Sequence, residues 1–295
     1  MRAAAILGLG CSPRDLRPFQ SDDSVEWQIG MPASSDGADA ILLFGGDGTI
    51  HRHLGQLVRL GLPVLVVPAG SGNDFATSLG LRKVRDSLAA WQKFLADQRK
   101  TRAIDLGVIT QHGEDPARNS VPGTRYFSCV AGVGIDAAVA ERANRMPRWL
   151  RGHGGYVLSL APAMFTFAPF PMKVFSPGDD GKWATRSDQP TLIAAFANTP
   201  LYGGGMKVAP QAKMDDGLLD VCVVGGLDPF KLFCLFPTVY AGKHLSIKAV
   251  QYFQSARARV ETEHPMDVYA DGEFVCRTPV EVSIEKAALK VIAPA

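Results

Sequence analysis

The chain has 295 residues and a formal net charge of +2, and 46% of its residues are hydrophobic. This length is enough for two domains of ordinary size, each with its own core. Acidic and basic residues are interleaved without a basic run, so the sequence gives no case for nucleic-acid binding. Its five cysteines are scattered and form no Cys-x-x-Cys pair, which predicts free thiols in a reducing cytoplasm and no zinc site.

The first third of the sequence alternates expected strands with expected helices. The N-terminal apolar run is too short for a secretory signal, and we interpret it as the first strand. Such an alternation predicts an α/β domain with a doubly wound sheet. The strands are expected near residues 3–9, 40–44, 63–67 and 102–106, and the helices near 49–60, 73–79 and 84–99.

The remaining sequence is rich in expected strands. A polar stretch with glycine and proline, residues 110–124, predicts a loop. The longest apolar stretch, Tyr156–Met172, is interrupted by prolines and is shorter than the roughly 20 residues that span a bilayer, so no transmembrane segment is predicted. A mainly antiparallel second domain is the simplest account. Its helices are expected near 135–145 and 153–167, and its strands near 172–175, 191–197, 218–224, 257–263, 266–270 and 280–284.

A Gly-rich turn directly follows the expected strand at 40–44. It reads Gly45-Gly46-Asp47-Gly48-Thr49, and helical apolar spacing follows it. The glycines can take positive φ and allow backbone N–H groups to approach an anion, and the N-terminus of a helix favours negative charge. Asp47 would repel a phosphate unless a divalent cation lay between them. The turn therefore predicts a magnesium-nucleotide site.

A second Gly-rich turn follows the next expected strand. It contains Gly70, Ser71, Gly72 and Asn73. One such turn alone could be an ordinary tight turn. Two of them at neighbouring strand ends favour a nucleotide site, because open α/β sheets bind ligands outside the carboxyl ends of their strands.

Together with later motifs, the two turns resemble the diacylglycerol kinase catalytic-domain family, which includes bacterial lipid kinases and the sphingosine and ceramide kinases. The resemblance covers most of the chain from about residue 40 onward. The family usually has an Asn-Pro-containing nucleotide loop after its first strand, where this chain has Gly8–Pro13. The later motifs are Phe127–Ala137, Asn198 with Tyr202–Met206, Asp215–Asp220 and Asp271–Glu273.

The resemblance implies a fold and a division into domains. The first domain is expected to be an α/β nucleotide-binding domain of the NAD kinase/phosphofructokinase-like type. It would comprise residues 1–110, with residues 286–295 returning to it. The second, residues 111–285, is expected to be a β-sandwich that binds the lipid substrate.

Asp271-Gly272-Glu273 is the expected catalytic motif. From the residues alone it could be only a hairpin turn, which Asp-Gly readily forms. Phosphoryl transfer to an alcohol needs a carboxylate that accepts or steers the hydroxyl proton, and the resemblance implies that this carboxylate lies here. We favour Glu273 as the base, with Asp271 as a helper or metal-water contact, although the two roles could be exchanged. Asp47 would position magnesium-ATP.

A second metal position is implied at the acidic turn that contains Asp215 and Asp216. The bare sequence is compatible with a simple turn. The resemblance implies a structural Mg²⁺ held by the carboxylate of Asp216 and the main-chain carbonyls of Lys213 and Leu218, a set of hard oxygen ligands that suits this ion. Asp215 or Asp220 could link the ion to the active site through water.

Three further features allow alternative interpretations. Gly132–Ala137 matches a dinucleotide-binding pattern, but no strand ending in an acid follows at the required distance, which argues against NAD-dependent redox chemistry. A basic cluster around Trp149 would suit anionic lipid headgroups or be an ordinary solvated face; it consists of Arg142, Arg145, Arg148 and Arg151. The segment Phe230–Phe236 could be buried or could enter a membrane interface.

The sequence therefore predicts a kinase of phospholipid metabolism that transfers the ATP γ-phosphoryl group to diacylglycerol or a related lipid alcohol. Mg²⁺ is the expected cofactor, and the expected location is the cytoplasm. Peripheral contact with the inner face of the membrane and formation of a homodimer are both left open. The enzymatic alternative is an NAD kinase or a phosphofructokinase-like kinase. A nucleotide- or lipid-binding regulator without catalysis is the other alternative, and the altered loop Gly8–Pro13 supports it.

Overall fold

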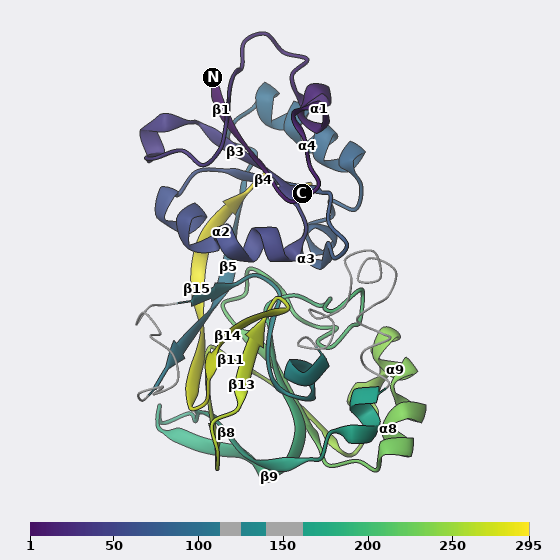
Figure 1. The fold of residues 1–295 in the computed structure, drawn as a ribbon. Coiled ribbons are helices and arrows are strands. Elements are labelled where there is room, and N and C mark those ends of the chain that lie inside the picture. Colours follow the sequence, from purple (N-terminus) through teal and green to yellow (C-terminus); the bar gives the residue numbers. More distant parts are fainter. Residues whose placement is uncertain (113–124, 140–161, 295) are drawn as a thin grey trace. The chain divides into compact units, whose positions relative to one another are not determined.

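The computed structural model describes residues 1–112, 125–139 and 162–294. The chain divides into two compact units, and Figure 1 shows the elements of each. Unit 1 comprises Met1–Leu106 and Lys286–Ala295, and unit 2 comprises Gly107–Glu285. Two strands, β5 (Arg102–Gln111) and β15 (Val280–Val291), have residues in both units.

Unit 1 is built on a parallel sheet. β1 (Arg2–Leu7) lies between β2 (Glu26–Ile29) and β3 (Ala40–Gly45), and β4 (Val64–Pro68) lies between β3 and the end of β15. Each of these pairings is parallel. β3 and β4 are apolar and buried along nearly their whole length, as is typical of a parallel sheet covered on both faces. The doubly wound nucleotide-binding fold predicted from the sequence is confirmed.

The helices of unit 1 pack their apolar faces against this sheet. α2 (Asp47–Leu60) and α4 (Val84–Ala96) bury residues at helical spacing. The ring of Trp91 in α4 lies 5.6 Å from that of Trp27 on β2. The buried side chains are Ile50, Leu54 and Leu57 in α2, and Ser87, Ala90, Trp91 and Phe94 in α4. The shorter elements are α1 (Pro13–Leu16), η1 (Arg17–Phe19), η2 (Ser35–Gly37) and α3 (Asp74–Ser78).

Unit 2 is mainly antiparallel, as expected from the sequence. Its long strand β9 (Trp183–Ala197) pairs with β8 (Phe170–Pro177) through its first part and with β7 (Val130–Gly134) and β10 (Leu219–Gly225) through its last part. One strand thereby takes part in two pairing systems, which is a usual way to build a sandwich. The other strands are β6 (Arg125–Phe127), β7 (Val130–Gly134), β8 (Phe170–Pro177), β10 (Leu219–Gly225), β11 (Val250–Ser255), β12 (Arg257–Thr262), β13 (Asp267–Ala270) and β14 (Glu273–Arg277).

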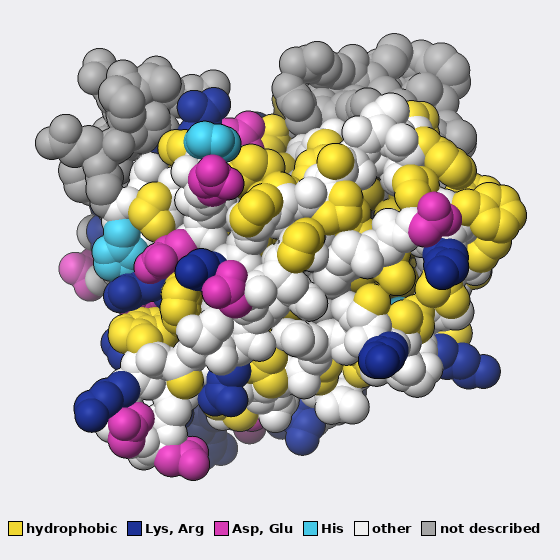
Figure 2. Space-filling view, turned by 90° about the horizontal axis from the view of Figure 1, so that it is seen from below, with side chains coloured by type: hydrophobic (Ala, Val, Ile, Leu, Met, Phe, Trp, Pro, Cys, Tyr) yellow, Lys and Arg dark blue, Asp and Glu magenta, His cyan; other side chains and the backbone are white. Residues whose placement is uncertain are grey.

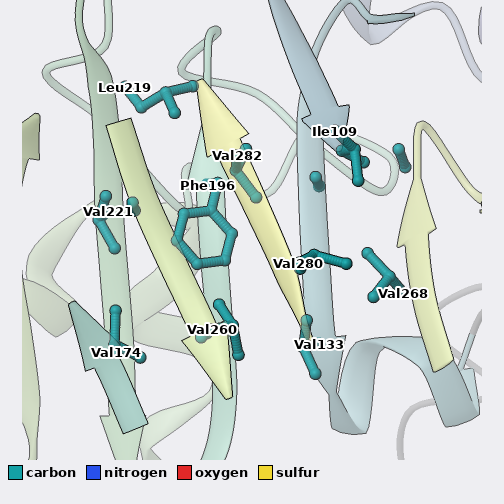
Figure 3. Close-up of a cluster of buried hydrophobic side chains, with 14 of the residues drawn as sticks. Ile109, Val133, Val174, Phe196, Leu219, Val221, Val260, Val268, Val280 and Val282 are labelled. Carbon is teal, nitrogen blue, oxygen red and sulfur yellow. The ribbon is translucent and has the colours of Figure 1, made fainter. Parts of the chain in front are cut away.

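The core of unit 2 is made by inward-facing β-branched and aromatic side chains from these strands. Figure 3 shows Phe196 among valines that come from several strands. Alternating burial along β8 and β12 places every second residue in this core, as the pleat of a strand requires. The labelled members are Ile109, Val133, Val174, Phe196, Leu219, Val221, Val260, Val268, Val280 and Val282.

Helical segments lie beside the strands of unit 2. α8 (Pro229–Leu235), α9 (Pro237–Tyr240) and η4 (Lys243–Ser246) follow β10, and residues 135–139 and 162–166 are also helical. The rest of the helices expected near 135–145 and 153–167 falls outside the described residues, as does the basic cluster around Trp149. In the described ranges, no helix is long and apolar enough to span a bilayer.

Several boundaries differ from the sequence prediction. β2, β6 and β11 were not predicted, because their mostly exposed or short sequences carry little apolar alternation. β5 continues to Gln111, beyond the expected end at 106. The strand expected near 280–284 is the first part of the longer strand β15, which continues to Val291.

Candidate functional site

Two glycine loops of unit 1 pack against each other where β3 and β4 end. A Cβ on Gly70 would lie 2.6 Å from the Gly46 nitrogen, and a Cβ on Gly46 would lie 2.9 Å from the Gly70 Cα. Real Cβ atoms do not approach other atoms this closely, so neither position has room for a side chain. The Asp47 N–H donates to the Gly72 carbonyl at 3.1 Å, which fixes the register of the two loops.

The reason for these glycines differs from the one expected. None of Gly45, Gly46, Gly48, Gly70 and Gly72 has a positive φ, so the positive φ expected for Gly45, Gly46 and Gly48 is not found. Their lack of a Cβ serves the close approach of one backbone to another. The loops are thereby brought together at the carboxyl edge of a parallel sheet, the usual ligand position in this architecture.

Asp47 joins the two loops through its side chain. Its carboxylate accepts the backbone N–H of Asp74 at 3.0 Å and that of Phe75 at 3.1 Å. These N–H groups belong to the first turn of α3, which has no partner for them within the helix. Asp47 therefore caps α3 although it lies in α2. Its direct role toward magnesium-ATP stays a prediction.

The second loop is closed by the side chain of Asn73. Its Oδ1 accepts the Gly70 N–H at 3.0 Å, and its Nδ2 donates to the Gly70 carbonyl at 2.8 Å. Both amide groups are thus used within the loop. Gly70 and Ser71 are exposed, so the closed loop presents its backbone and the Ser71 hydroxyl to solvent.

The third loop at this edge, Gly8–Pro13, is held through Thr49. A Cβ on Gly8 would lie 2.9 Å from Thr49 Oγ1, and one on Gly45 would lie 2.8 Å from the same atom. The Thr49 side chain therefore occupies the space between the ends of β1 and β3. The Gly8 N–H also donates to the Phe44 carbonyl at 2.7 Å. The sequence predicted Thr49 as part of the nucleotide-binding turn but did not indicate this packing.

In unit 2, Asp271 anchors the start of β7. It turns the β13–β14 hairpin with φ 51°, followed by Gly272 with φ 83°, and its side chain is buried. One carboxylate oxygen accepts the N–H and Oγ–H of Ser128 at 2.8 and 3.1 Å. The other accepts the N–H groups of Cys129 and Val130 at 2.8 and 3.3 Å. Asp271 therefore fixes the backbone beside its own turn.

Glu273 begins β14 directly after this turn and is partly exposed. Within the described residues its carboxylate forms no hydrogen bond or ion pair, in contrast to that of Asp271. The two acids of the predicted motif thus differ in surroundings: one is engaged by four donors, and the other is accessible to water.

A second buried acid of unit 2 lies within the motif Phe127–Ala137. Asp136 is buried, and both of its carboxylate oxygens accept from the Tyr202 hydroxyl, at 2.9 and 2.8 Å. Tyr202 leads into Gly203, Gly204 and Gly205, which all have positive φ. The pair therefore ties a turn of three glycines to the segment that follows β7. Spacing alone could not pair these residues, which lie 66 positions apart.

The three predicted structural-metal ligands lie within one turn of unit 2. The Asp216 carboxylate accepts the Leu218 N–H at 3.0 Å, Gly217 has φ 74°, and Lys213 and Asp216 are exposed. A carboxylate with two main-chain carbonyls is a hard-oxygen set that water can complete at an exposed turn, so the residues fit Mg²⁺. Among the described residues, no cluster of three or more His, Cys, Asp or Glu side chains suits a metal.

Asp220, two residues beyond the turn, is a buried acid with neutral partners. It accepts from the Tyr252 hydroxyl at 2.5 Å and from the Gln254 amide at 3.2 Å. Burial raises the pKa of Asp220 above its usual range, and the two hydrogen bonds partly oppose this shift. The acid is thus held within unit 2 by the polar side chains of Tyr252 and Gln254.

Comparison with known proteins assigns both parts of the chain. Residues 21–109 match the family described as diacylglycerol kinase catalytic domain. Residues 129–293 match the YegS C-terminal NAD kinase beta sandwich-like domain. The chain is 34% identical over 262 residues to a diacylglycerol kinase of Mycobacterium tuberculosis, an alignment that covers 89% of this chain and 79% of the relative.

Solved structures share the fold. A diacylglycerol kinase from Bacillus anthracis superposes with a TM-score of 0.64 at 17% identity, covering 99% of this chain and 96% of that one. An NAD kinase from Archaeoglobus fulgidus in complex with ATP superposes with a TM-score of 0.52 at 16% identity, covering 99% and 92%. At these identities the likeness shows the fold alone. The sequence identity to the mycobacterial enzyme and the two domain matches show that the chain belongs to the diacylglycerol kinase family.

Proposed function

We propose that the chain transfers the γ-phosphoryl group of ATP to the hydroxyl of a lipid alcohol, with diacylglycerol as the acceptor. Membership of the diacylglycerol kinase family makes it an ATP-dependent phosphotransferase that acts on a lipid alcohol. The acceptor is proposed from the name of the mycobacterial relative. The structural observation that carries the proposal is the contact between the two glycine loops, which Asp47 holds together.

The loops would bind the phosphates of ATP. Gly45–Thr49 lies at the N-terminus of α2, a helix of 14 residues whose dipole favours negative charge there. Gly70–Asn73 is closed by its own Asn73 side chain and needs little ordering when a ligand binds. A preorganised, positively polarised loop pair suits phosphoryl transfer, in which positioning and charge neutralisation supply most of the acceleration.

Mg²⁺ is proposed in two places. Asp47 would hold the ion that accompanies ATP; Lys213, Asp216 and Leu218 would hold a structural one. When bound with ATP, the ion neutralises charge on the phosphates. The Asp47 carboxylate accepts backbone N–H groups of α3, and its negative charge suits a divalent cation. Asp47 is therefore proposed to serve the loops and the nucleotide at once.

Glu273 is proposed as the base that accepts the proton of the lipid hydroxyl. The contrast with Asp271 supports this choice, because Asp271 accepts four hydrogen bonds from Ser128, Cys129 and Val130 and is buried. A base must reach the proton that it removes. The partly exposed carboxylate of Glu273 meets that requirement better, and Asp271 becomes a positioning residue.

A transfer assay tests the proposal. The full chain would be incubated with Mg²⁺ and ATP labelled in its γ-phosphoryl group, against diacylglycerol, sphingosine, ceramide, NAD and fructose 6-phosphate. We expect label in diacylglycerol. Label in NAD or the sugar phosphate alone would overturn the lipid assignment. A calorimetric titration with ATP run beside it addresses the regulator alternative, because ATP binding without transfer to any acceptor would favour a protein that has lost catalysis.

A further inference from the structure

Three phenylalanines of unit 2 form an exposed surface. Phe230 and Phe233 of α8 are 68% and 48% exposed, and Phe165, in the helical residues 162–166, is 55% exposed. The ring centroids of Phe165 and Phe233 lie 5.9 Å apart, so the two helical segments contribute to one patch. We call these three residues the phenylalanine surface.

α8 is apolar on both of its sides. Leu232 and Phe236 pack inward against the buried cluster of Ile135, Val139, Ala163 and Met164. Phe230, Phe233 and Cys234, at positions i, i+3 and i+4, form the opposite side and are exposed. The water-facing side of a surface helix is normally polar. The outward side of α8 is therefore unusual, and packing within the described residues does not account for it.

The segment that contains α8, α9 and η4 is basic in sequence. From Pro229 to Val260 the sequence contains no Asp or Glu, whereas Lys231, Lys243 and Lys248 are exposed. The acid that precedes α8, Asp228, caps it by accepting the N–H groups of Phe230 and Lys231 at 3.0 and 3.2 Å. Figure 2 shows hydrophobic side chains gathered on the side where Figure 1 places α8 and α9, with both basic and acidic side chains beside them.

We propose that the phenylalanine surface docks on an anionic lipid bilayer. The aromatic rings would enter the interfacial region, where their apolar area leaves water, and the three lysines would face the headgroups. Exposed aromatic side chains on a helix that also carries an exposed lysine, Lys231, are complementary to such a surface. An acidic protein partner could bind the lysines, but it would not require three exposed phenylalanines. The proposed function supplies the reason for docking, because the acceptor lipid resides in a bilayer.

The docking face is tested by co-sedimentation of the full chain with phosphatidylcholine vesicles, with or without phosphatidylglycerol. ATP and Mg²⁺ are left out, so catalysis plays no part. We expect wild-type chain to bind anionic vesicles more tightly than neutral ones and to dissociate as salt is raised. The double variant F230S/F233S should bind more weakly by about tenfold for each phenylalanine removed.

A matched control comes from unit 1. Ile29 and Val84 are 61% and 42% exposed, close to the values of the two phenylalanines. I29S/V84S removes a similar apolar area far along the sequence from α8, and it should bind vesicles like wild type. If F230S/F233S binds like wild type, or if the control loses as much binding, the proposal is overturned.

The lysines are tested in the same assay. K231Q/K243Q/K248Q should lose about fivefold in affinity for each lysine toward anionic vesicles and should reduce the salt dependence. K93Q/K100Q/K290Q, three exposed lysines of unit 1, is the control and should behave like wild type. Equal binding of wild type to neutral and anionic vesicles would overturn the anionic character of the surface.

Two further measurements separate the remaining outcomes. Turnover of a short-chain, water-soluble diacylglycerol should be unchanged in F230S/F233S, because no docking is needed. If wild type shows no such turnover and yet F230S/F233S loses vesicle binding, the proposed function fails while docking stands. Light scattering reports the oligomeric state; if the variant dissociates an oligomer and keeps its vesicle binding, a second copy of the chain covers the surface and docking is overturned.

Discussion

The backbones of Gly46 and Gly70 touch, and a Cβ on Gly70 would lie 2.6 Å from the Gly46 nitrogen. Gly46 follows β3 and Gly70 follows β4, so this contact joins two neighbouring loops at one edge of the parallel sheet. The shape of the proposed phosphate site therefore depends on the absence of two side chains. It can be tested by adding a single methyl group.

Gly46→Ala should abolish measurable ATP binding, because the added Cβ forces the loops apart. Overpacking of this kind costs about 1–3 kcal/mol of unfolding free energy. Gly55→Ala is the control: Gly55 lies inside α2 with no atom within 4 Å of an added Cβ. That change should stabilise the fold by about 0.5–1 kcal/mol and leave ATP binding unchanged. Calorimetric titration and denaturant unfolding measure both effects, and a Gly46→Ala variant with wild-type affinity would contradict the account.

Asp47→Ala should abolish detectable turnover and lower stability by about 1 kcal/mol, since two N–H groups of α3 lose their acceptor. Asp86→Ala is the matched control, because it also removes a carboxylate that accepts a backbone N–H at the start of a helix. Asp86 accepts the Lys83 N–H at 2.9 Å at the start of α4. That variant should lose a similar amount of stability and keep full turnover. Normal kcat and magnesium dependence in Asp47→Ala would show that the carboxylate has no part in the reaction.

Glu273→Gln and Asp271→Asn should fail in different ways. The first removes the proposed base from a partly exposed position, so kcat should fall by about 10²- to 10⁴-fold with the melting temperature and ATP binding kept. The second replaces a carboxylate that accepts four hydrogen bonds by an amide. The free energy of unfolding of Asp271→Asn should therefore be lower than that of wild type by about 1–3 kcal/mol. Steady-state kinetics and thermal melting distinguish them. A nearly normal kcat in Glu273→Gln beside an inactive, fully stable Asp271→Asn would move the base to Asp271.

Mg²⁺ should raise the melting temperature of wild type, and Asp216→Asn should remove most of this rise by weakening the proposed structural site. Asp180→Asn is the control: Asp180 accepts the Lys182 N–H at 3.0 Å in a turn, as Asp216 accepts that of Leu218, but no metal is proposed there. Its melting curve should keep the magnesium response. An unchanged response in Asp216→Asn would remove the site from the account.

Stability should fall as the pH is lowered through the range where histidine titrates, because of His244. Burial lowers the pKa of His244 from its usual 6.5, the hydrogen bond to the Val208 carbonyl partly opposing the shift. Because the pKa of His244 is lower in the folded chain than in the unfolded chain, the stability that its neutral imidazole contributes is fully present above the pKa of the unfolded state. That stability is lost as the pH falls from this value toward the pKa of the folded state. His244→Gln should flatten the dependence of unfolding free energy on pH between about 7 and 5. The exposed-histidine variant His264→Gln should keep the wild-type slope, and an unchanged slope in His244→Gln would assign the dependence elsewhere.

The sequence predicted the parallel sheet well because β3 and β4 are unbroken apolar runs between glycine-rich turns. The edge strand β2 was missed, since three of its four residues are exposed and the pattern carries no apolar period. For α8, the sequence likewise did not show which side chains are exposed. Its apolar sequence was compatible with burial, and only the structure shows that Phe230 faces water.

For the candidate site, the sequence indicated the loops but not the contacts that hold them. Asp47 is conspicuous between glycines, yet its hydrogen bonds to α3 depend on how β3 and β4 pair. Asp271 and Ser128 lie 143 residues apart, so no local spacing could show that one anchors the other. Roles that depend on long-range pairing were therefore inaccessible, whereas residue types at strand ends were informative.

Phosphoryl transfer to diacylglycerol is measured with wild-type chain and Mg²⁺, using ATP labelled in the γ-phosphoryl group and, in parallel, ATP labelled in the α-phosphoryl group. We expect the lipid fraction to gain label from the γ-labelled nucleotide only, and Glu273→Gln to transfer little. Absence of label in the lipid, with NAD labelled or with ATP bound and no acceptor modified, would contradict the assignment of this chain as a diacylglycerol kinase.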